Sequence, residues 1–175
     1  MLMISLQLNV SRLAVYVHKD LIVKVRTDLM NDTFNSVWLK CGLPRQNKIL
    51  VCNIYRQWQL PKQGNDKTSA TVNSQLERFV TFLVQWEQTL SSGREICILG
   101  DFNLDFLNVG KDNLPANSQS VRLRPLVQQL FDRIIPHAFV QMVSVFTRSW
   151  PNQAPSGLDH FWTNRPEKSL EVHAH

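Results

Sequence analysis

Asp101 and Asn103 are the residues whose types and spacing most directly suggest chemistry, and they follow the apolar run Ile96-Cys97-Ile98-Leu99. Such a run is typical of a buried strand, and side chains two positions apart at its end lie on the same side of a sheet. Gly100 lets the backbone turn there because it has no Cβ. A carboxylate and an amide at this spacing could hold a water or a hard metal ion through oxygen atoms. A strand followed by an ordinary Asx turn has the same pattern, and for an isolated Asp-x-Asn this alternative is favoured.

Three further segments carry side chains suited to the same chemistry. They are Asn53-Ile54-Tyr55-Arg56, Thr147-Arg148 and Leu158-Asp159-His160. With residues 100–103 they supply acids, amides, a phenol and guanidinium groups, mostly at the ends of apolar runs. This set suits phosphodiester cleavage, in which a hard cation and an arginine bind the phosphate while Asp and Asn position and deprotonate water.

The elements that must position these residues can be predicted from hydrophobic periodicity. Strands joined by short turns, in an antiparallel meander, are predicted at 13–17, 21–25, 34–39 and 49–55. Apolar residues spaced by three and four predict helices at 71–90 and 120–134, and Gly93 lies just beyond the first. Further strands are predicted at 96–99, 139–148 and 157–163.

This order of elements predicts an α+β protein. We expect an α/β sandwich of two packed mixed or antiparallel β-sheets with flanking helices. The 175 residues fit one domain with a substantial core. Residues 1–175 are therefore treated as a single domain.

Composition and charge narrow the class of partner and the compartment. There are 19 Lys and Arg against 14 Asp and Glu, a net charge of +5. This balance permits a polyanionic partner without requiring one, because many basic proteins bind no nucleic acid. No apolar stretch approaches the roughly 18 residues of a membrane span, and the start lacks a basic signal-peptide region. Cys41, Cys52 and Cys97 lie in apolar runs and are predicted to be buried reduced thiols. We expect a protein that is not secreted, has no membrane partner and is intracellular, either nuclear or cytoplasmic.

The segments together resemble the endonuclease/exonuclease/phosphatase superfamily, and specifically the endonuclease domain of LINE-type (non-LTR) retrotransposon polyproteins. The resemblance runs over residues 12–18, 25–29, 54–56, 99–105, 146–148 and 156–164. Its most specific part is Gly-Asp-Phe-Asn-Leu-Asp with a downstream Thr-Arg and then Leu-Asp-His-x-x-Thr-Asn, in this order and spacing.

The resemblance implies a catalytic role for four residues. Asp101 would orient or deprotonate the attacking water, and Asn103 would be its partner on the scissile phosphate. The hydroxyl of Tyr55 would reach the phosphate or the leaving oxygen. Asp159 would support the catalytic histidine, as the acid does in hydrolase triads.

The resemblance also implies contacts with nucleic acid. Thr147 and Arg148 match positions that contact DNA backbone or flipped nucleotides, and Arg56 is a further predicted contact. Each has a structural alternative: Tyr55 and Arg56 could be a strand end with solvated tips, and Thr147-Arg148 could be an ordinary exposed turn.

Mg²⁺, or Mn²⁺, is the cofactor that the resemblance implies, with Asp101 and Asn103 as an incomplete site. The family's metal-binding glutamate and its terminal Ser-Asp-His element find no match, so the domain is predicted to be truncated at both ends and to bind metal weakly. His160 alternates away from Asp159 along its strand and is not predicted to be the base. His173 and His175 are predicted to be a terminal tail rather than ligands.

Three functional hypotheses follow. The first is a fragment of a Mg²⁺-dependent phosphodiesterase that nicks DNA, weakly active or inactive alone, with a reverse-transcriptase domain as a partner in a longer polyprotein. The second is a non-enzymatic remnant that binds nucleic acid or is inert. The third is another branch of the superfamily, such as an inositol-phosphate or sphingomyelin phosphodiesterase. The sequence leaves open whether the chain is an enzyme.

Overall fold

The computed structural model describes residues 2–4, 13, 15–30, 35–43, 45, 47–56, 68–107, 119–149, 151 and 155–168. Within this part, none of the helices is long and apolar enough to cross a membrane.

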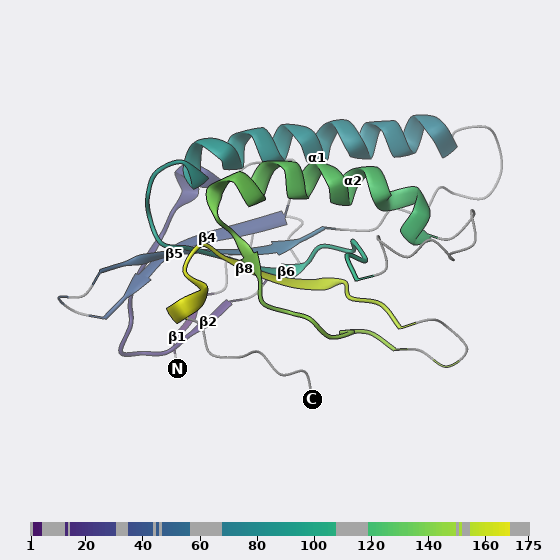
Figure 1. The fold of residues 1–175 in the computed structure, drawn as a ribbon. Helices are drawn as coiled ribbons and strands as arrows, with labels where there is room; N and C mark the ends of the chain where they lie inside the picture. Colours follow the sequence, from purple (N-terminus) through teal and green to yellow (C-terminus); the bar gives the residue numbers. More distant parts are fainter. Residues whose placement is uncertain are drawn as a thin grey trace.

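A mixed sheet of six strands forms the centre of the molecule, in the order β3-β4-β5-β6-β8-β7 (Figure 1). Its strands are β3 (Ile22–Val25), β4 (Asn35–Gly42), β5 (Ile49–Tyr55), β6 (Ile96–Asp101), β7 (Val140–Gln141) and β8 (Asp159–Thr163). All neighbours are antiparallel except β5 and β6, which are parallel. Helix α1 (Thr68–Leu90) lies between β5 and β6 in the chain and makes the crossover that a parallel pair needs.

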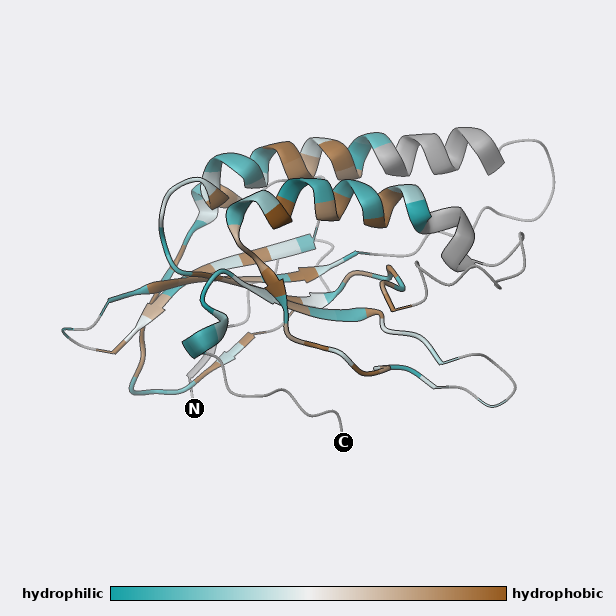
Figure 2. Cartoon of the chain, in the orientation of Figure 1, coloured by the Kyte–Doolittle hydropathy of each residue, from teal (hydrophilic) through white to brown (hydrophobic). Residues whose placement is uncertain are grey.

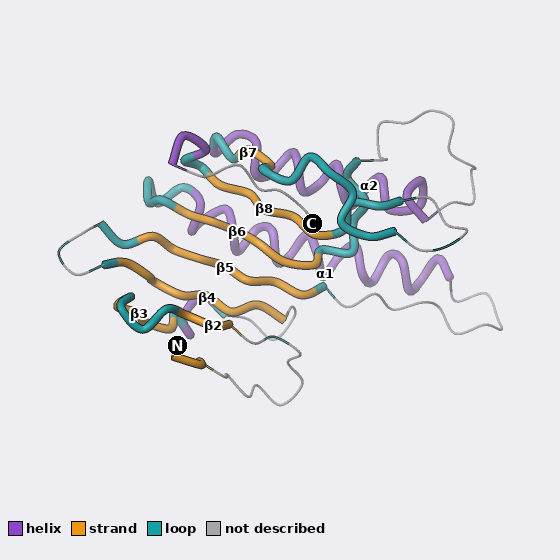
Figure 3. Tube along the Cα trace, turned by 90° about the horizontal axis from the view of Figure 1, so that it is seen from below, coloured by secondary structure: helices purple, strands orange, loops and turns teal. Residues whose placement is uncertain are grey.

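Helices α1 and α2 (Gln119–Ile134) lie side by side on one face of this sheet, as Figures 1 and 3 show. Three short 3₁₀ turns complete the described elements: η1 (Thr27–Leu29), η2 (Ile135–His137) and η3 (Pro166–Lys168). In the coloured turns of both helices, most apolar residues face the sheet and most polar ones face away, as Figure 2 shows. This pattern is the amphipathic spacing that predicted both helices.

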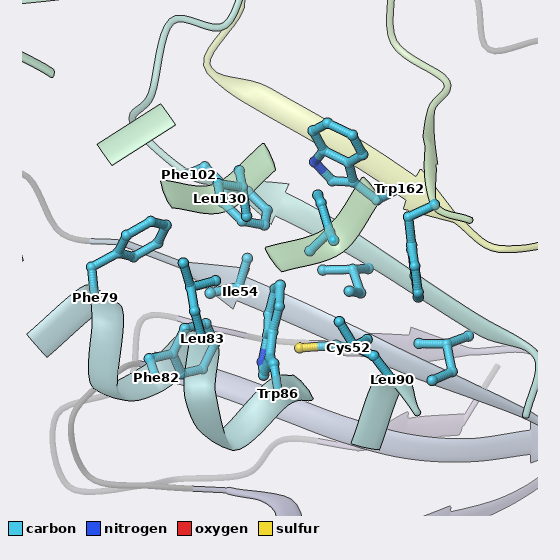
Figure 4. Packing of buried hydrophobic residues seen from close by; sticks show 14 of the residues in the cluster. Cys52, Ile54, Phe79, Phe82, Leu83, Trp86, Leu90, Phe102, Leu130 and Trp162 are labelled. Carbon is cyan, nitrogen blue, oxygen red and sulfur yellow. The ribbon is translucent and has the colours of Figure 1, made fainter. Parts of the chain in front are cut away.

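The main core lies between the sheet and the helices (Figure 4). Alternate residues of β5, among them Cys52 and Ile54, point into it and are 0% exposed. On the helix side Trp86 packs edge-on against Trp38 and Phe102, with ring centroids 6.1 and 6.2 Å apart. Aromatic burial of this kind contributes a large share of the apolar area removed from water.

A smaller second core covers the other face of the sheet at its β4 end. Val17 of β2 (Val15–Val17) packs with Val37, Leu39 and Cys41. β2 pairs antiparallel with β1 (Leu2–Ile4), which makes a separate two-stranded sheet. The predicted α+β architecture of packed sheets flanked by helices is therefore confirmed.

Two predictions about single elements were wrong. Only β3, β4 and β5 form the meander, because β2 pairs with β1 instead. Strand β1 is an additional strand that none of these predictions covered. The strand predicted at 139–148 is reduced to β7, since the Gln141 side-chain oxygen accepts the backbone N–H groups of Val143 and Phe161, at 3.2 and 2.8 Å. In a longer strand pair, these two N–H groups would donate to backbone carbonyl groups instead. Residues 14 and 34 of the predicted strands lie outside the described part.

Gly100 allows β5 and β6 to approach closely just before Asp101. Its φ is +133°, and a Cβ added there would lie 2.0 Å from the carbonyl oxygen of Ile54. Both the backbone conformation and the space exclude a side chain. Gly100 thus allows Asp101 to lie beside β5.

We predict that Gly100→Ala lowers the free energy of unfolding by roughly 3 kcal/mol or more, because it combines backbone strain with a backbone clash. Gly93→Ala is the matched control: its φ is +67°, but nothing lies within 4 Å of the added Cβ. That control should lose only about 1 kcal/mol, the strain of a left-handed alanine. Urea denaturation measures both, and equal losses would contradict the clash.

Candidate functional site

Tyr55, Asp101 and Asp159 form one row across three neighbouring strands. In the register of the sheet Tyr55 lies opposite Asp101, and Asp101 lies opposite Asp159. Directly opposed residues share a face, and the alternate residues Ile54 and His160 are buried on the helix side. The row therefore lies on the face away from the helices. The structure brings these three predicted residues together.

Asn35 extends this row by a fourth polar residue that the sequence analysis missed. It lies opposite Tyr55 in the β4–β5 register and is half-buried. The alternation of β4 had placed Asn35 on the face opposite Trp38. The missing information was the hairpin register, which the turn sequence alone did not supply.

Asp101 is electrostatically the most perturbed acid of the row. Partial burial raises its pKa above the ordinary value, and the nearby Asp159 carboxylate raises it as well. The backbone N–H of Asn103 and the charges of Arg148 and Arg56 lower it by less than this. A carboxylate whose proton affinity is raised is a better acceptor for a proton from water.

Asn103 is held in a tight turn directly beside Asp101. Its φ is +49°, and its backbone N–H donates to Oδ1 of Asp101 at 2.8 Å. This is the Asx turn that was the structural alternative for the motif, and the turn itself is present. The Asn103 side chain is 7% exposed and its Nδ2 donates to the carbonyl of Arg56 at 2.7 Å. Because a carbonyl only accepts, this bond assigns the amide orientation and leaves Oδ1 to meet other donors or a cation.

Arg56 is buried and holds the loop that follows β6. Its side chain donates from Nε to the carbonyl of Phe102 at 2.6 Å and from Nη2 to that of Asn103 at 2.8 Å, and the residue is 4% exposed. Its backbone N–H donates to the carbonyl of Asp101 at 2.9 Å. Burial lowers its pKa to about 10, against the raising effect of Asp101, so it stays protonated at neutral pH.

The predicted surface role of Arg56 does not match this position. A direct contact with nucleic acid needs an accessible guanidinium, whereas Arg56 is only 4% exposed, and the alternative of a solvated tip does not fit this burial either. Arg56 is a positioning residue, because its planar fork suits two carbonyl groups at once.

Thr147 and Arg148 lie next to the row and differ in what they do. Oγ1 of Thr147 accepts the backbone N–H groups of Leu158 and Asp159, both at 3.1 Å, and so positions the start of β8. Arg148 pairs with Ser156 through the backbone, and its side chain is exposed. Arg148 is thus the accessible cation near Asp101 among the predicted contacts.

Asp105 is a second positioning residue that the sequence analysis did not single out. It is 7% exposed, and its Oδ1 accepts the backbone N–H of Gly157 at 3.1 Å. This bond ties the loop after β6 to the segment before Asp159. The signal was the second acid of the Gly-Asp-Phe-Asn-Leu-Asp motif, four residues after Asp101.

His160 belongs to the core and not to the row, as its alternation with Asp159 predicts. It stacks on Phe102 with ring centroids 4.6 Å apart. The indole N–H of Trp162 lies 3.2 Å from Nδ1, which must accept it, so the ring proton is on Nε2 and is donated to the Leu104 carbonyl at 2.8 Å. The imidazole is therefore neutral, and burial lowers its pKa from 6.5 to about 4.

In the described part of the chain, no cluster of three or more carboxyl, thiol or imidazole groups is arranged so that it could hold a metal ion. The described oxygen ligands near Asp101 include its own carboxylate, that of Asp159, the Asn103 amide and the Tyr55 hydroxyl. The predicted tail residues His173 and His175 lie outside the described residues.

The fold is similar to that of a solved endonuclease domain. Among solved structures it is similar to "Endonuclease domain of TRAS1, a telomere-specific non-LTR retrotransposon", with a TM-score of 0.51 and 18% identity. The similarity covers 85% of this chain and 56% of the other, so the chain spans little more than half of that structure. No protein-family model matches the sequence, and no curated protein matches it. The structural likeness confirms the fold that the motifs predicted.

We predict that His160 makes folding stability depend on pH. The unfolded chain binds this proton near pH 6.5 and the folded protein only near pH 4, so acidification favours unfolding between these values. The contribution is fully present above pH 6.5 and falls by about 1.4 kcal/mol per unit, roughly 3 kcal/mol in all. His160→Gln should lower the free energy of unfolding at pH 7, and the variant should no longer show this pH-dependent loss. Denaturant titrations from pH 7 to 4 measure it, and parallel curves for the two proteins would refute it.

We predict that Arg56→Lys destabilises the protein by about 1–3 kcal/mol, because one ammonium cannot replace a fork that satisfies two buried carbonyls. Arg148→Lys, at an exposed position, should change stability by less than about 0.5 kcal/mol. Thermal or urea unfolding measures both. A stable Arg56→Lys protein would show that Arg56 does not hold the loop.

Proposed function

We propose that this chain is part of a metal-dependent phosphodiesterase, a DNA-nicking endonuclease of the non-LTR retrotransposon type that is weakly active alone. The observation that carries the proposal is the row Tyr55-Asp101-Asp159 beside the turn that holds Asn103. The endonuclease fold supports it independently. In a longer polyprotein, its partner would be a reverse-transcriptase domain.

Each polar group beside the row has a role that its position supports. Asp101, with its raised pKa, accepts the proton of the attacking water. The Tyr55 hydroxyl donates to a phosphate oxygen or to the leaving oxygen. The exposed Arg148 guanidinium binds the phosphate backbone, while Asn103 orients the scissile phosphate. Asp159 is held at the start of β8 by Thr147, where it would support a catalytic histidine.

A divalent ion fits the donor set only partly. Asp101 and Asn103 would hold Mg²⁺ or Mn²⁺ through oxygen, which both ions accept, and Asp159 adds a nearby carboxylate. When bound, the ion would neutralise charge on the phosphate. Mg²⁺ commonly uses one or two carboxylates and completes its shell with water and phosphate oxygens. Weak binding is therefore the expectation.

A second candidate is a protein that binds nucleic acid without cutting it. The absence of a third acidic, thiol or imidazole ligand among the described residues favours this, as does the commitment of His160 to the core. The exposed Arg148 and the net charge of +5 would remain available for phosphate contacts.

We predict slow nicking of supercoiled plasmid in millimolar Mn²⁺ or Mg²⁺ that Asp101→Asn abolishes. The variant removes the acid but keeps an oxygen for the Asn103 N–H, so the fold survives. Asp20→Asn, an exposed acid in the β2–β3 turn, is the control and should nick like the parent. Gel assays measure nicking, and Mn²⁺ electron paramagnetic resonance measures metal binding.

The outcomes separate the two candidates. Metal-dependent nicking and Mn²⁺ binding that both need Asp101 support the nuclease. Salt-sensitive DNA binding with no nicking and no Asp101-dependent metal binding would replace it with the binding protein. Nicking that persists in Asp101→Asn would place the chemistry elsewhere.

A further inference from the structure

A basic hollow of about 530 Å³ lies at the end of the sheet opposite the Asp101 row. Among the described residues, five cationic side chains line it and Glu95 is the one carboxylate. The five are Lys40, Lys48, Arg94, Arg165 and Lys168. The volume is in the range of ligand sites, roughly 300–1,000 Å³, but the charged lining suits a polar anion rather than an apolar ligand.

The cations come from four separate parts of the chain. Lys40 is on β4 and Lys48 lies just before β5, whereas Arg94 precedes β6 and the last two follow β8. Figures 1 and 3 show the start of β6 at the same end of the sheet as the end of β4 and the start of β5. No single helix face or charge run therefore explains the cluster, since only the fold gathers it.

Most of this charge has no partner acid. Lys168 pairs with Glu95 at 2.6 Å, and Arg165 approaches Glu167 at 4.0 Å. In the described part of the chain, no ion pair is formed by Lys40, Lys48 or Arg94. Like charges around one hollow repel each other, and a bound polyanion would remove that repulsion.

The backbone under the cluster is already fixed. The Asn164 side chain donates to the Arg94 carbonyl at 2.7 Å and accepts the Ile96 N–H at 2.9 Å. The Leu50 N–H donates to the Glu95 carbonyl at 2.9 Å. A ligand would thus have to order only the side chains, which lowers the entropic cost of binding.

The hollow is separate from the Asp101 row. β6 runs from Ile96, beside the hollow, to Asp101, and five strand steps correspond to roughly 16 Å. Arg165 follows the end of β8, whereas Asp159 begins it. A ligand phosphate in the hollow would not reach the row.

We propose that this hollow is a second anion site, which binds a phosphate-bearing polyanion independently of the Asp101 row. Phosphate is the matching chemistry because several cations of both types, Lys as point charges and Arg as planar forks, converge on one polar space. The phosphates belong either to a nucleic-acid strand or to a small oligophosphate.

The test compares Arg94→Gln/Arg165→Gln with Lys19→Gln/Arg78→Gln. Both doubles remove two exposed positive charges, and neither residue of the second lines the hollow. Fluorescence anisotropy of a labelled twelve-nucleotide single strand and calorimetry with inorganic tripolyphosphate give the affinities. Lys48→Glu, on another element, provides an independent second variant. Circular dichroism checks that each variant is folded.

We expect the hollow variants to bind about tenfold or more weakly at 0.1 M salt and the control less than twofold. For the strand, the slope of log affinity against log salt should fall by about 1.4, because each lost single-strand phosphate contact changes it by about 0.7. If the hollow variants lose affinity for tripolyphosphate, phosphate alone is a sufficient ligand. If they lose affinity for the DNA strand but not for tripolyphosphate, the ligand is a nucleic-acid backbone. Both outcomes support the site. No binding of either probe, or equal losses in the two doubles, would overturn it. Arg148→Gln reports separately on the row, so the proposed nuclease can fail while this site stands.

Discussion

The bond from the buried Arg56 guanidinium to the carbonyls of Phe102 and Asn103 joins the end of β5 to the loop after β6. Two carbonyls that would otherwise lie buried without a donor are satisfied by one side chain, which makes the contact costly to lose. Asn103 returns a hydrogen bond to the Arg56 carbonyl, so the loop is closed from both sides. The position of Asn103 beside Asp101, and with it the whole polar site, depends on this pair of contacts.

Successive side chains of β8 point to opposite faces of the sheet, so that one face carries the polar row and the other carries the core. Asp159 faces the row, and the next residue, His160, faces the core, where Leu104 and Trp162 hold it neutral. A charged imidazole would need a second acceptor where Trp162 supplies a donor. The histidine next to the acid is thus a stacking and hydrogen-bonding residue of the core. Motif matching alone would have invited the opposite assignment, whereas the pleat of the strand excludes it.

The two ends of the sheet differ in charge and in what they could bind. At one end Asp101 and Asp159 lie opposite each other near the exposed Arg148. At the other end lysines and arginines surround a hollow with one lining carboxylate. Parallel β5 and β6 create this polarity, because the chain ends of both strands meet at one edge and their beginnings meet at the other. The charge that a phosphate group would meet therefore differs between the two ends of the sheet.

The sequence by itself determined the helices, most strands and the segments that meet at the site, since periodicity and strand ends are local properties. It also determined that His160 turns away from Asp159, because alternation needs no partner strand. Only the tertiary structure decided the register that adds Asn35 to the row, the burial of Arg56 and the bond from Asp105 to Gly157. It alone gathered the five cations of the hollow from four parts of the chain. These features depend on which strands become neighbours, and that choice is set by packing over long sequence separations rather than by local residue pattern.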